Sequence, residues 1–172
     1  MLERSLQGTS QSIGPGQVDG GSTMLIIQFY KSVGEYGYLS NLFPCNIELW
    51  GRVFPSAEHA YQYRKFKDRK IADWAMTAPA PRFIAILAHG LFPYDVTENW
   101  TTLKIDVMRE VLFQKFRQNP ELFTKLKVET EGKELQEASK SDKFWGIGKK
   151  GDGQNMLGKL LMELRDRGFN NA

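Results

Sequence analysis

The sequence predicts a helix-dominated α+β fold in a single domain, with a small β-hairpin or sheet near its N-terminus. Short segments rich in β-branched and aromatic residues precede residue 56. After that point, apolar residues recur at the three- and four-residue steps of amphipathic helices. The 172 residues contain no internal repeat and no second change in composition, so one domain is expected.

The first 23 residues differ in composition from the rest of the chain. They hold five Gly, four Ser and three Gln but no aromatic residue. Such a segment cannot bury enough apolar surface to offset the entropy of ordering. We therefore expect a disordered tail over residues 1–23 and a folded domain over residues 24–172, which carries a net charge of about +4 by formal count.

Two β segments are expected at the start of the domain. Residues 24–30 (MLIIQFY) have the β-branched and aromatic content of a strand. Residues 46–54 are interrupted by Gly51 and are typical of a hairpin.

Helices are expected from residue 56 onward. Ser56 precedes the first helix as its N-cap, and the apolar spacing predicts one long helix over roughly residues 100–118. Asn119-Pro120 then begins another helix, with Asn as N-cap and Pro in the first turn. A last amphipathic helix is marked by Leu157, Leu160, Leu161 and Leu164.

Composition excludes several kinds of chemistry. One cysteine, Cys45, and two histidines leave too few ligands for a disulfide scaffold or a metal centre, so neither metal nor cofactor is expected. The longest apolar run, Phe83 to Ala88, is far too short to cross a membrane, and a cytoplasmic protein is expected. A net charge of +3 suits an anionic small molecule but is low for a protein that binds duplex nucleic acid.

A glycine-rich loop covers residues 146–151 (GIGKKG). It matches the dinucleotide-binding fingerprint in letters, but only about twenty residues follow it, too few for the βαβ unit that this fingerprint opens. The Walker spacing of Gly148 and Gly153 lacks the following Lys and Ser/Thr. Two alternatives remain: a loop in which Lys149 and Lys150 hold one phosphate, or a solvated turn capped by Asn155.

The helix after Ser56 carries a candidate catalytic group. Helical spacing places Glu58, Tyr61, Gln62 and Lys65 on one face. The helix N-terminus favours the ionised form of Glu58, which would suit the carboxylate for stabilising a developing cation or orienting water. The alternative is that Glu58 only complements the helix dipole, and His59 is expected to be structural.

Three tryptophans, Trp50, Trp100 and Trp145, lie in polar, loop-like surroundings. Most tryptophans belong to a core, which is the default for each of these. Trp145, beside Asp142 and a glycine loop, is better placed to stack on a heterocyclic base than Trp50, which lies in the hairpin.

Taken together and in order, these motifs resemble the NADAR, or YbiA-like, domain family. The matching segments are Tyr36–Pro44 (YGYLSNLFP), Pro55–Gln62 (PSAEHAYQ), Lys65-Phe66, Asn99-Trp100, Met108, Lys115-Phe116, Asp142, Trp145–Gly148 (WGIG) and Gly153–Met162 (GQNMLGKLLM). They extend over nearly all of the chain after residue 24.

The resemblance implies an N-glycosidase that hydrolyses the ribosyl C1–N bond of phosphoribosylamino-pyrimidine intermediates of riboflavin synthesis. Other family members are linked to removal of ADP-ribose from a nucleobase such as guanine, so ADP-ribosylated nucleic acid is an alternative partner. A binding module for nucleotide or ADP-ribose without turnover is a third reading. Nothing in the sequence indicates an oligomeric state.

The resemblance also assigns residues. Glu58 would be the catalytic glutamate, acting with water and no metal. The substrate-binding residues would be Trp100, Asp142, Trp145, Asn155, Gly148, Asn41, Gln62 and Lys65.

Overall fold

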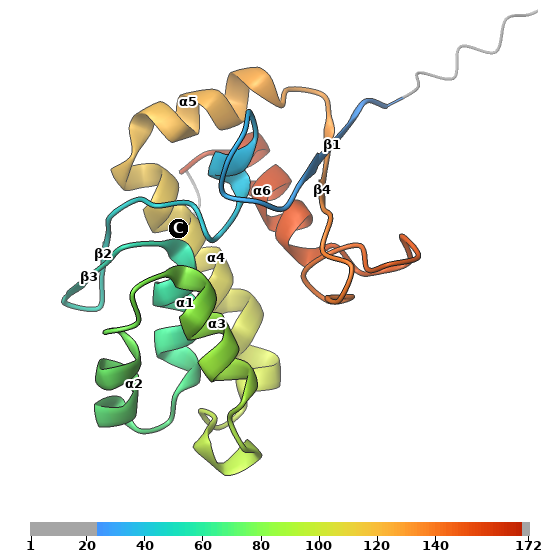
Figure 1. Cartoon of the computed structure of the whole chain (residues 1–172). Coiled ribbons are helices and arrows are strands. Elements are labelled where there is room, and N and C mark those ends of the chain that lie inside the picture. The colour runs from blue at the N-terminus through green and yellow to red at the C-terminus, as the bar shows by residue number, and fades with distance from the viewer. Residues whose placement is uncertain (1–23, 170–172) are drawn as a thin grey trace, which may run out of the picture.

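The computed structural model of the chain describes residues 24–169, and the tail expected over residues 1–23 lies outside them. In this part the chain forms the α+β, helix-rich single domain that the sequence predicts (Figure 1). The elements in chain order are β1 (Ile26–Phe29), η1 (Gly37–Leu39), β2 (Ile47–Leu49), β3 (Arg52–Phe54), α1 (Ala57–Lys65), α2 (Arg69–Ala75), α3 (Pro81–His89), η2 (Pro93–Asp95), α4 (Trp100–Gln118), α5 (Pro120–Glu129), β4 (Glu134–Glu137) and α6 (Met156–Arg167).

The strands form two small sheets. The predicted hairpin is present as the antiparallel pair β2–β3, and its turn residues Trp50 and Gly51 have φ angles of 52° and 71°. Two successive positive φ values are typical of a tight hairpin turn. The predicted first strand, β1, pairs in parallel with β4, so that Phe29 lies opposite Glu137. Strand β4 was not predicted, because the sequence pattern indicates strands only before residue 56.

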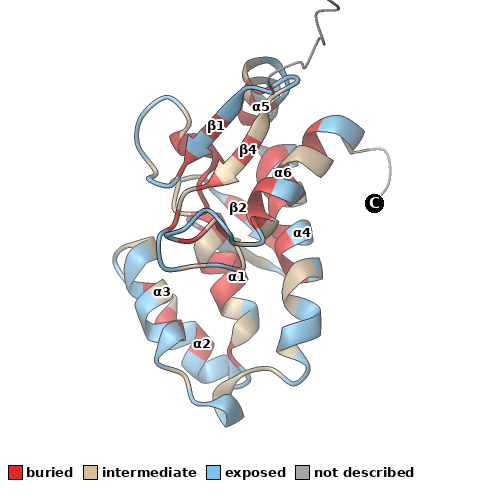
Figure 2. Ribbon diagram, turned by 90° about the vertical axis from the view of Figure 1, so that its right-hand side faces the viewer, coloured by how far each residue is buried: buried red, intermediate tan, exposed pale blue. Residues whose placement is uncertain are grey.

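Helix α4 is the centre of the domain, and its bounds match the predicted range. It packs against α1, β2, α5 and α6, which places its buried side chains in the main hydrophobic core. A second, smaller core joins α2 and α3 to the end of α1. Figure 2 shows that α2 and α3 have largely exposed outer faces, whereas buried residues dominate around α1 and α6.

Asn119 is the N-cap residue of α5, as expected, but its side chain does not cap the helix. Its side-chain amide donates to Lys115 O at 2.8 Å and to Asn46 O at 3.3 Å, and no side-chain cap forms. The end of α4 offers free carbonyl groups, which compete successfully for this amide. Asn119 therefore joins α4 to the loop before β2.

The core contains a buried ammonium group. Lys115 on α4 has no solvent exposure, and its Nζ donates to Tyr38 O at 2.7 Å and Ser40 O at 2.9 Å. Burial lowers the pKa of Lys115 to about 8. These contacts fix the segment around η1 against α4, and that segment leads directly into the pocket described below.

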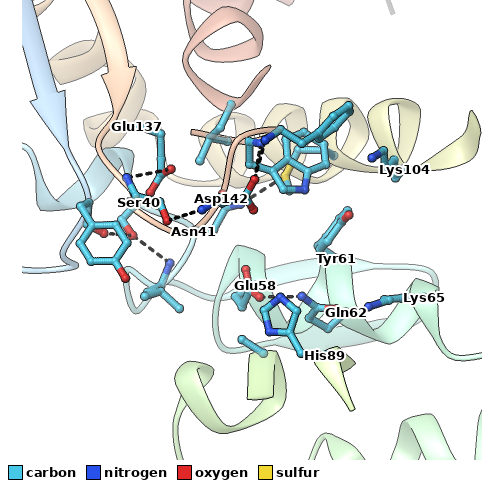
Figure 3. Close-up of a pocket in the computed structure, with 18 of the residues that line it drawn as sticks. Ser40, Asn41, Glu58, Tyr61, Gln62, Lys65, His89, Lys104, Glu137 and Asp142 are labelled. Carbon is cyan, nitrogen blue, oxygen red and sulfur yellow. Dashed lines mark hydrogen bonds between the residues drawn. The ribbon is translucent and has the colours of Figure 1, made fainter. Parts of the chain in front are cut away.

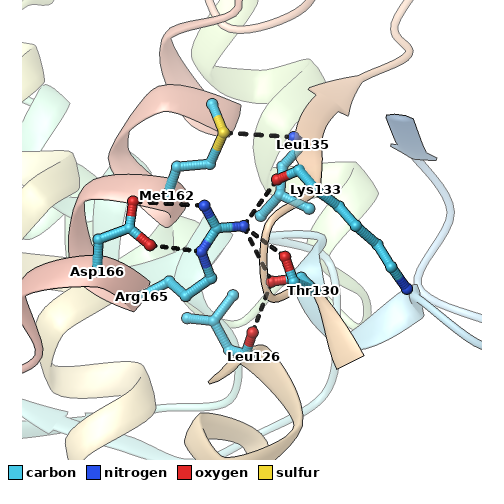
Figure 4. A network of polar contacts seen from close by, with 7 residues as sticks. All are labelled: Leu126, Thr130, Lys133, Leu135, Met162, Arg165 and Asp166. Atoms are coloured by element: carbon cyan, nitrogen blue, oxygen red, sulfur yellow. Dashed lines mark hydrogen bonds and ion pairs between the residues drawn. The ribbon is translucent and has the colours of Figure 1, made fainter. Parts of the chain in front are cut away.

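An arginine fixes the junction of α5, β4 and α6 (Figure 4). Arg165 on α6 is nearly buried and donates through Nη1 to Thr130 O at 2.6 Å and to Lys133 O at 2.8 Å. Both carbonyls belong to the turn between α5 and β4. The guanidinium thus satisfies backbone groups that would otherwise be buried without partners.

Candidate functional site

A pocket of about 400 Å³ opens where η1, α1, α3, α4 and the segment after β4 meet (Figure 3). Its lining combines aromatic rings with three carboxylates and two lysines. The lining residues are Tyr30, Ser40, Asn41, Leu42, Glu58, Tyr61, Gln62, Lys65, Ala85, His89, Trp100, Thr101, Lys104, Met108, Glu137, Ser139, Asp142, Phe144, Trp145 and Leu157.

Glu58 lies in the first turn of α1, after the N-cap Ser56, whose hydroxyl accepts the His59 N–H at 3.3 Å. The Glu58 N–H donates to Asn41 O at 2.9 Å, so the helix start is joined to the segment after η1. Gln62 Nε2 donates to Glu58 Oε1 at 2.7 Å. The Glu58 carboxylate is therefore oriented by Gln62 of the same helix, and the Glu58 backbone is fixed by the segment after η1.

The ionisation of Glu58 differs from the sequence expectation. Burial raises the pKa of its carboxyl, although the Gln62 hydrogen bond and the charge of Lys65 lower it; Asp142 across the pocket raises it further. Desolvation of the carboxylate is thus the largest influence on its pKa, whereas the sequence argument considered only the field of the helix N-terminus. A carboxylate with a raised pKa is a stronger base than a solvated one and is better able to accept a proton from water.

The predicted helix face does line the pocket. Glu58, Tyr61, Gln62 and Lys65 all contribute to it. Lys65 Nζ donates to Ala88 O of α3 at 2.6 Å. Burial lowers the pKa of Lys65, and the charge of Glu58 partly offsets that effect.

Asp142 organises the loop after β4. Its Oδ1 accepts the N–H groups of Phe144 at 2.7 Å and Trp145 at 2.8 Å, and its own N–H donates to Ser139 Oγ at 3.1 Å. This turn presents the Asp142 carboxylate and the Trp145 ring to the same pocket. In Figure 3, Asp142 and Glu137 lie across the pocket from Glu58 and Gln62.

Aromatic rings form one wall. Tyr61 packs between Trp100, with ring centroids 5.2 Å apart, and Trp145, at 5.5 Å with an interplanar angle of 86°. Trp145 and Trp100 are both only partly buried. Trp50 lies outside the pocket, where its indole N–H donates to Glu110.

Glu137, at the C-terminal end of β4, is a pocket residue that the sequence analysis missed. Burial raises its pKa to about 7; the Ser139 N–H lowers it, and the charges of Asp142 and Glu58 raise it. The sequence pattern that could have predicted Glu137 is weak, because β4 is only four residues long and its partner strand lies more than a hundred residues earlier.

Lys104 was also missed. It lies on the pocket side of α4, one turn after Trp100, and its Nζ lies 3.2 Å from the centroid of the Phe144 ring. Its pKa is lowered by burial and raised by the charge of Asp142. The helical spacing from Trp100 could have identified it.

Two predicted substrate-binding residues lie outside the pocket lining. Asn155 is buried, and its amide joins neighbouring backbone instead: Nδ2 donates to Leu135 O at 2.8 Å, and Oδ1 accepts the Glu137 N–H at 3.0 Å. Gly148 has a φ of +67° and packs against Lys143. The exposed Lys149 and Lys150 are not lining residues either, so the cations of the pocket are Lys65 and Lys104.

Within residues 24–169, no cluster of three or more His, Cys, Asp or Glu side chains is arranged to hold a metal ion. Over the same range, no helix is both long enough and apolar enough to span a membrane.

Comparison with known proteins gives a consistent result. The family model of the NADAR domain matches residues 28–167. N-glycosidase YbiA of Escherichia coli (strain K12) is 36% identical over 142 residues, which cover 83% of this chain and 88% of that protein. The NMR structure of E. coli YbiA superposes with a TM-score of 0.74, covering 83% of this chain and 84% of that one.

A longer protein is also similar. Riboflavin biosynthesis protein VVA0006 of Vibrio vulnificus (strain YJ016) is 35% identical over 140 residues. The match covers 81% of this chain but only 38% of the Vibrio protein. The similarity therefore concerns one part of that protein.

Proposed function

This chain belongs to the NADAR domain family, and on that premise we propose that it is an N-glycosidase, a hydrolase that cleaves the C1–N bond between a ribose and a base. The observation that carries the proposal is the position of Glu58. Its carboxylate lines a pocket that also contains an aromatic wall and two lysines. A carboxylate, a stacking surface and an anion-binding group are what hydrolysis of a phosphoribosylated base requires.

Glu58 is the proposed catalytic residue. Cleavage of a ribosyl C–N bond passes through a state in which C1 carries positive charge. A carboxylate near C1 stabilises that charge and accepts a proton from the attacking water. The hydrogen bond from Gln62 and the charge of Lys65 support the ionised form that this role needs.

The remaining pocket residues divide by chemistry. Trp145, Trp100 and Tyr61 offer rings on which the base would stack. Lys65 and Lys104 are the cations available for a 5′-phosphate. Asn41 and Asp142 offer polar groups to the ribose. Asn155 would contribute indirectly, because its amide holds the backbone of Glu137.

We propose a phosphoribosylamino-pyrimidine of riboflavin synthesis as the substrate. Support comes from the similarity to two proteins, the N-glycosidase YbiA and the riboflavin biosynthesis protein of Vibrio vulnificus.

The proposal is tested by incubating the purified protein with a phosphoribosylamino-pyrimidine and, in parallel, with ADP-ribosyl-guanine, and separating the products by chromatography. Release of free pyrimidine and ribose 5-phosphate in the first reaction is the expected result. Release of ADP-ribose in the second reaction alone would assign the other substrate. Binding of either compound without any product would indicate a non-catalytic module.

A further inference from the structure

Cleavage of a ribosylamine bond requires a proton on the leaving nitrogen, because an amine leaves very poorly as an anion. Glu58, as proposed, removes a proton from water and therefore cannot supply this one at the same time. We propose that Glu137 is the proton donor to the leaving nitrogen, an inference that rests on the proposed N-glycosidase function. In the described part of the chain it is the pocket carboxyl with the fewest groups that stabilise a negative charge.

Hydrogen bonds of both backbone groups of Glu137 fix its position. It ends β4, its N–H donates to Asn155 Oδ1 at 3.0 Å, and its carbonyl accepts the Ile147 N–H at 2.8 Å. A Cβ at Gly146 would lie only 2.0 Å from Glu137 Oε2, so the glycine lets the loop close tightly over the carboxyl. The residue is 8% exposed and lines the pocket, so its acid group is both held in place and shielded from bulk water.

The charges of the pocket are distributed unequally among its three carboxyls. Lys65 lies in the field of Glu58, and Lys104 lies in the field of Asp142. None of the three carboxyls forms an ion pair with a lysine or arginine among residues 24–169, and no cation contributes to the ionisation of Glu137 there. Each of the other two carboxyls thus has a nearby cation, and Glu137 has none.

Hydrogen bonding shows the same contrast. One N–H, that of Ser139, donates to Glu137 Oε2 at 3.2 Å, whereas two backbone N–H groups donate to Asp142 Oδ1. The charged groups that act on Glu137 are Asp142 from the loop and Glu58 from α1, and Tyr30, directly after β1, lines the same pocket. Two neighbouring carboxylates and burial favour the neutral acid, as in other sites where paired carboxyls divide acid and base roles.

Two protons move in the proposed step. The C1–N bond breaks, its electron pair stays on nitrogen, and the proton of Glu137 moves to that nitrogen. A water oxygen bonds to C1, and its proton moves to Glu58. The products are the free amine and ribose with a hydroxyl at C1; Glu58 then loses its proton to solvent and Glu137 regains one.

The test compares two leaving groups in the Glu137→Gln variant, which keeps the size and the acceptor for Ser139. On a phosphoribosylamino-pyrimidine we expect kcat to fall on the order of a hundredfold or more. On nitrophenyl riboside 5-phosphate, whose nitrophenolate leaves as a stable anion, kcat should stay within about threefold, because no protonation is needed. Glu58→Gln should lose activity on both substrates.

Glu134→Gln is the matched control, since Glu134 lies on the same strand outside the pocket and should leave both rates unchanged. Glu137→Asp retains an acid and should recover part of the amine activity. In the wild type, the kcat of the amine substrate should fall at alkaline pH, and Glu137→Gln should lack that decline. Equal losses on both substrates, or unchanged amine hydrolysis, would overturn the role of Glu137. A wild type inactive on both substrates and also on ADP-ribosyl-guanine would overturn the N-glycosidase function itself.

Discussion

Gln62 Nε2 donates a hydrogen bond of 2.7 Å to Glu58 Oε1, one helical turn away on the same face of α1. The amide orients the carboxylate and favours its ionised form, whereas burial disfavours that form. The basicity of Glu58 therefore depends on a balance between two effects.

Glu58→Gln should abolish most turnover while leaving binding intact, because the amide cannot accept a proton or stabilise the charge at C1. We expect kcat to fall by about 10²- to 10⁴-fold. The dissociation constant of the intact substrate, measured by calorimetry with the inactive variant, should stay within a few fold of the wild-type KM. Glu48→Gln, on the exposed side of β2, is the control. Near-normal turnover in Glu58→Gln would remove Glu58 from the mechanism.

Gln62→Met should shift the pH dependence of kcat/KM. The Gln62 hydrogen bond lowers the pKa of Glu58, so its loss raises that pKa further. The base must be ionised, so kcat/KM increases as pH rises through the pKa of Glu58. In the variant this increase should occur at a higher pH. The measurement is a full pH–rate profile of both proteins; superimposable acid limbs would show that Glu58 is not the titrating base.

Trp145→Ala should weaken binding of the base. Stacking of a base on an aromatic ring contributes about 1–3 kcal/mol, which predicts a rise in KM of roughly 5- to 150-fold. Trp145→Phe should retain much of the affinity. Trp74→Ala, at a largely exposed position on α2 outside the pocket, serves as control. An unchanged KM with a lower melting temperature would instead identify Trp145 as a packing residue.

Asn155→Ala should destabilise the fold. Two buried hydrogen bonds are lost, and alanine is strained at the observed φ of 52°, so the free energy of unfolding should fall by about 2–4 kcal/mol. Asn155→Gly loses the same hydrogen bonds, but glycine adopts this φ without strain. Its free energy of unfolding should therefore be about 1 kcal/mol higher than that of Asn155→Ala. Urea unfolding measures both. Unchanged stability together with a raised KM would return Asn155 to direct substrate contact.

The sequence predicted those parts of the fold and the site that depend on interactions between residues close together in the chain. The long helix α4, the Ser56 cap and the pocket face of α1 all follow from spacing along one segment. Strand β4 and Glu137 depend on a partner that is more than a hundred residues away, and no local pattern encodes that pairing. The side chains of Asn119 and Asn155 illustrate the same limit, because both cap-like residues bond to backbone brought near only by the folded chain.

The buried Lys115 should make stability depend on pH. Its pKa is about 8 in the folded protein and near 10.5 when exposed in the unfolded chain, because burial disfavours the charged form. Below pH 8 both states carry the proton, and the folded state bears the full desolvation cost. Between these two pKa values the unfolded chain keeps the proton that the folded chain has released, so the free energy of unfolding rises with pH.

Lys115→Met isolates this contribution, since methionine does not titrate and the other groups largely cancel in the difference. The variant should be less stable by a constant amount at neutral pH, because Tyr38 O and Ser40 O lose their donor. From pH 8 to 10.5 the wild type should then gain about 3 kcal/mol relative to the variant. Urea titrations of both proteins at several pH values give the difference in the free energy of unfolding. Stability curves that stay parallel would mean that the Lys115 ammonium is not desolvated. They would also argue against the role of Lys115 in holding the segment that positions Asn41 and Glu58.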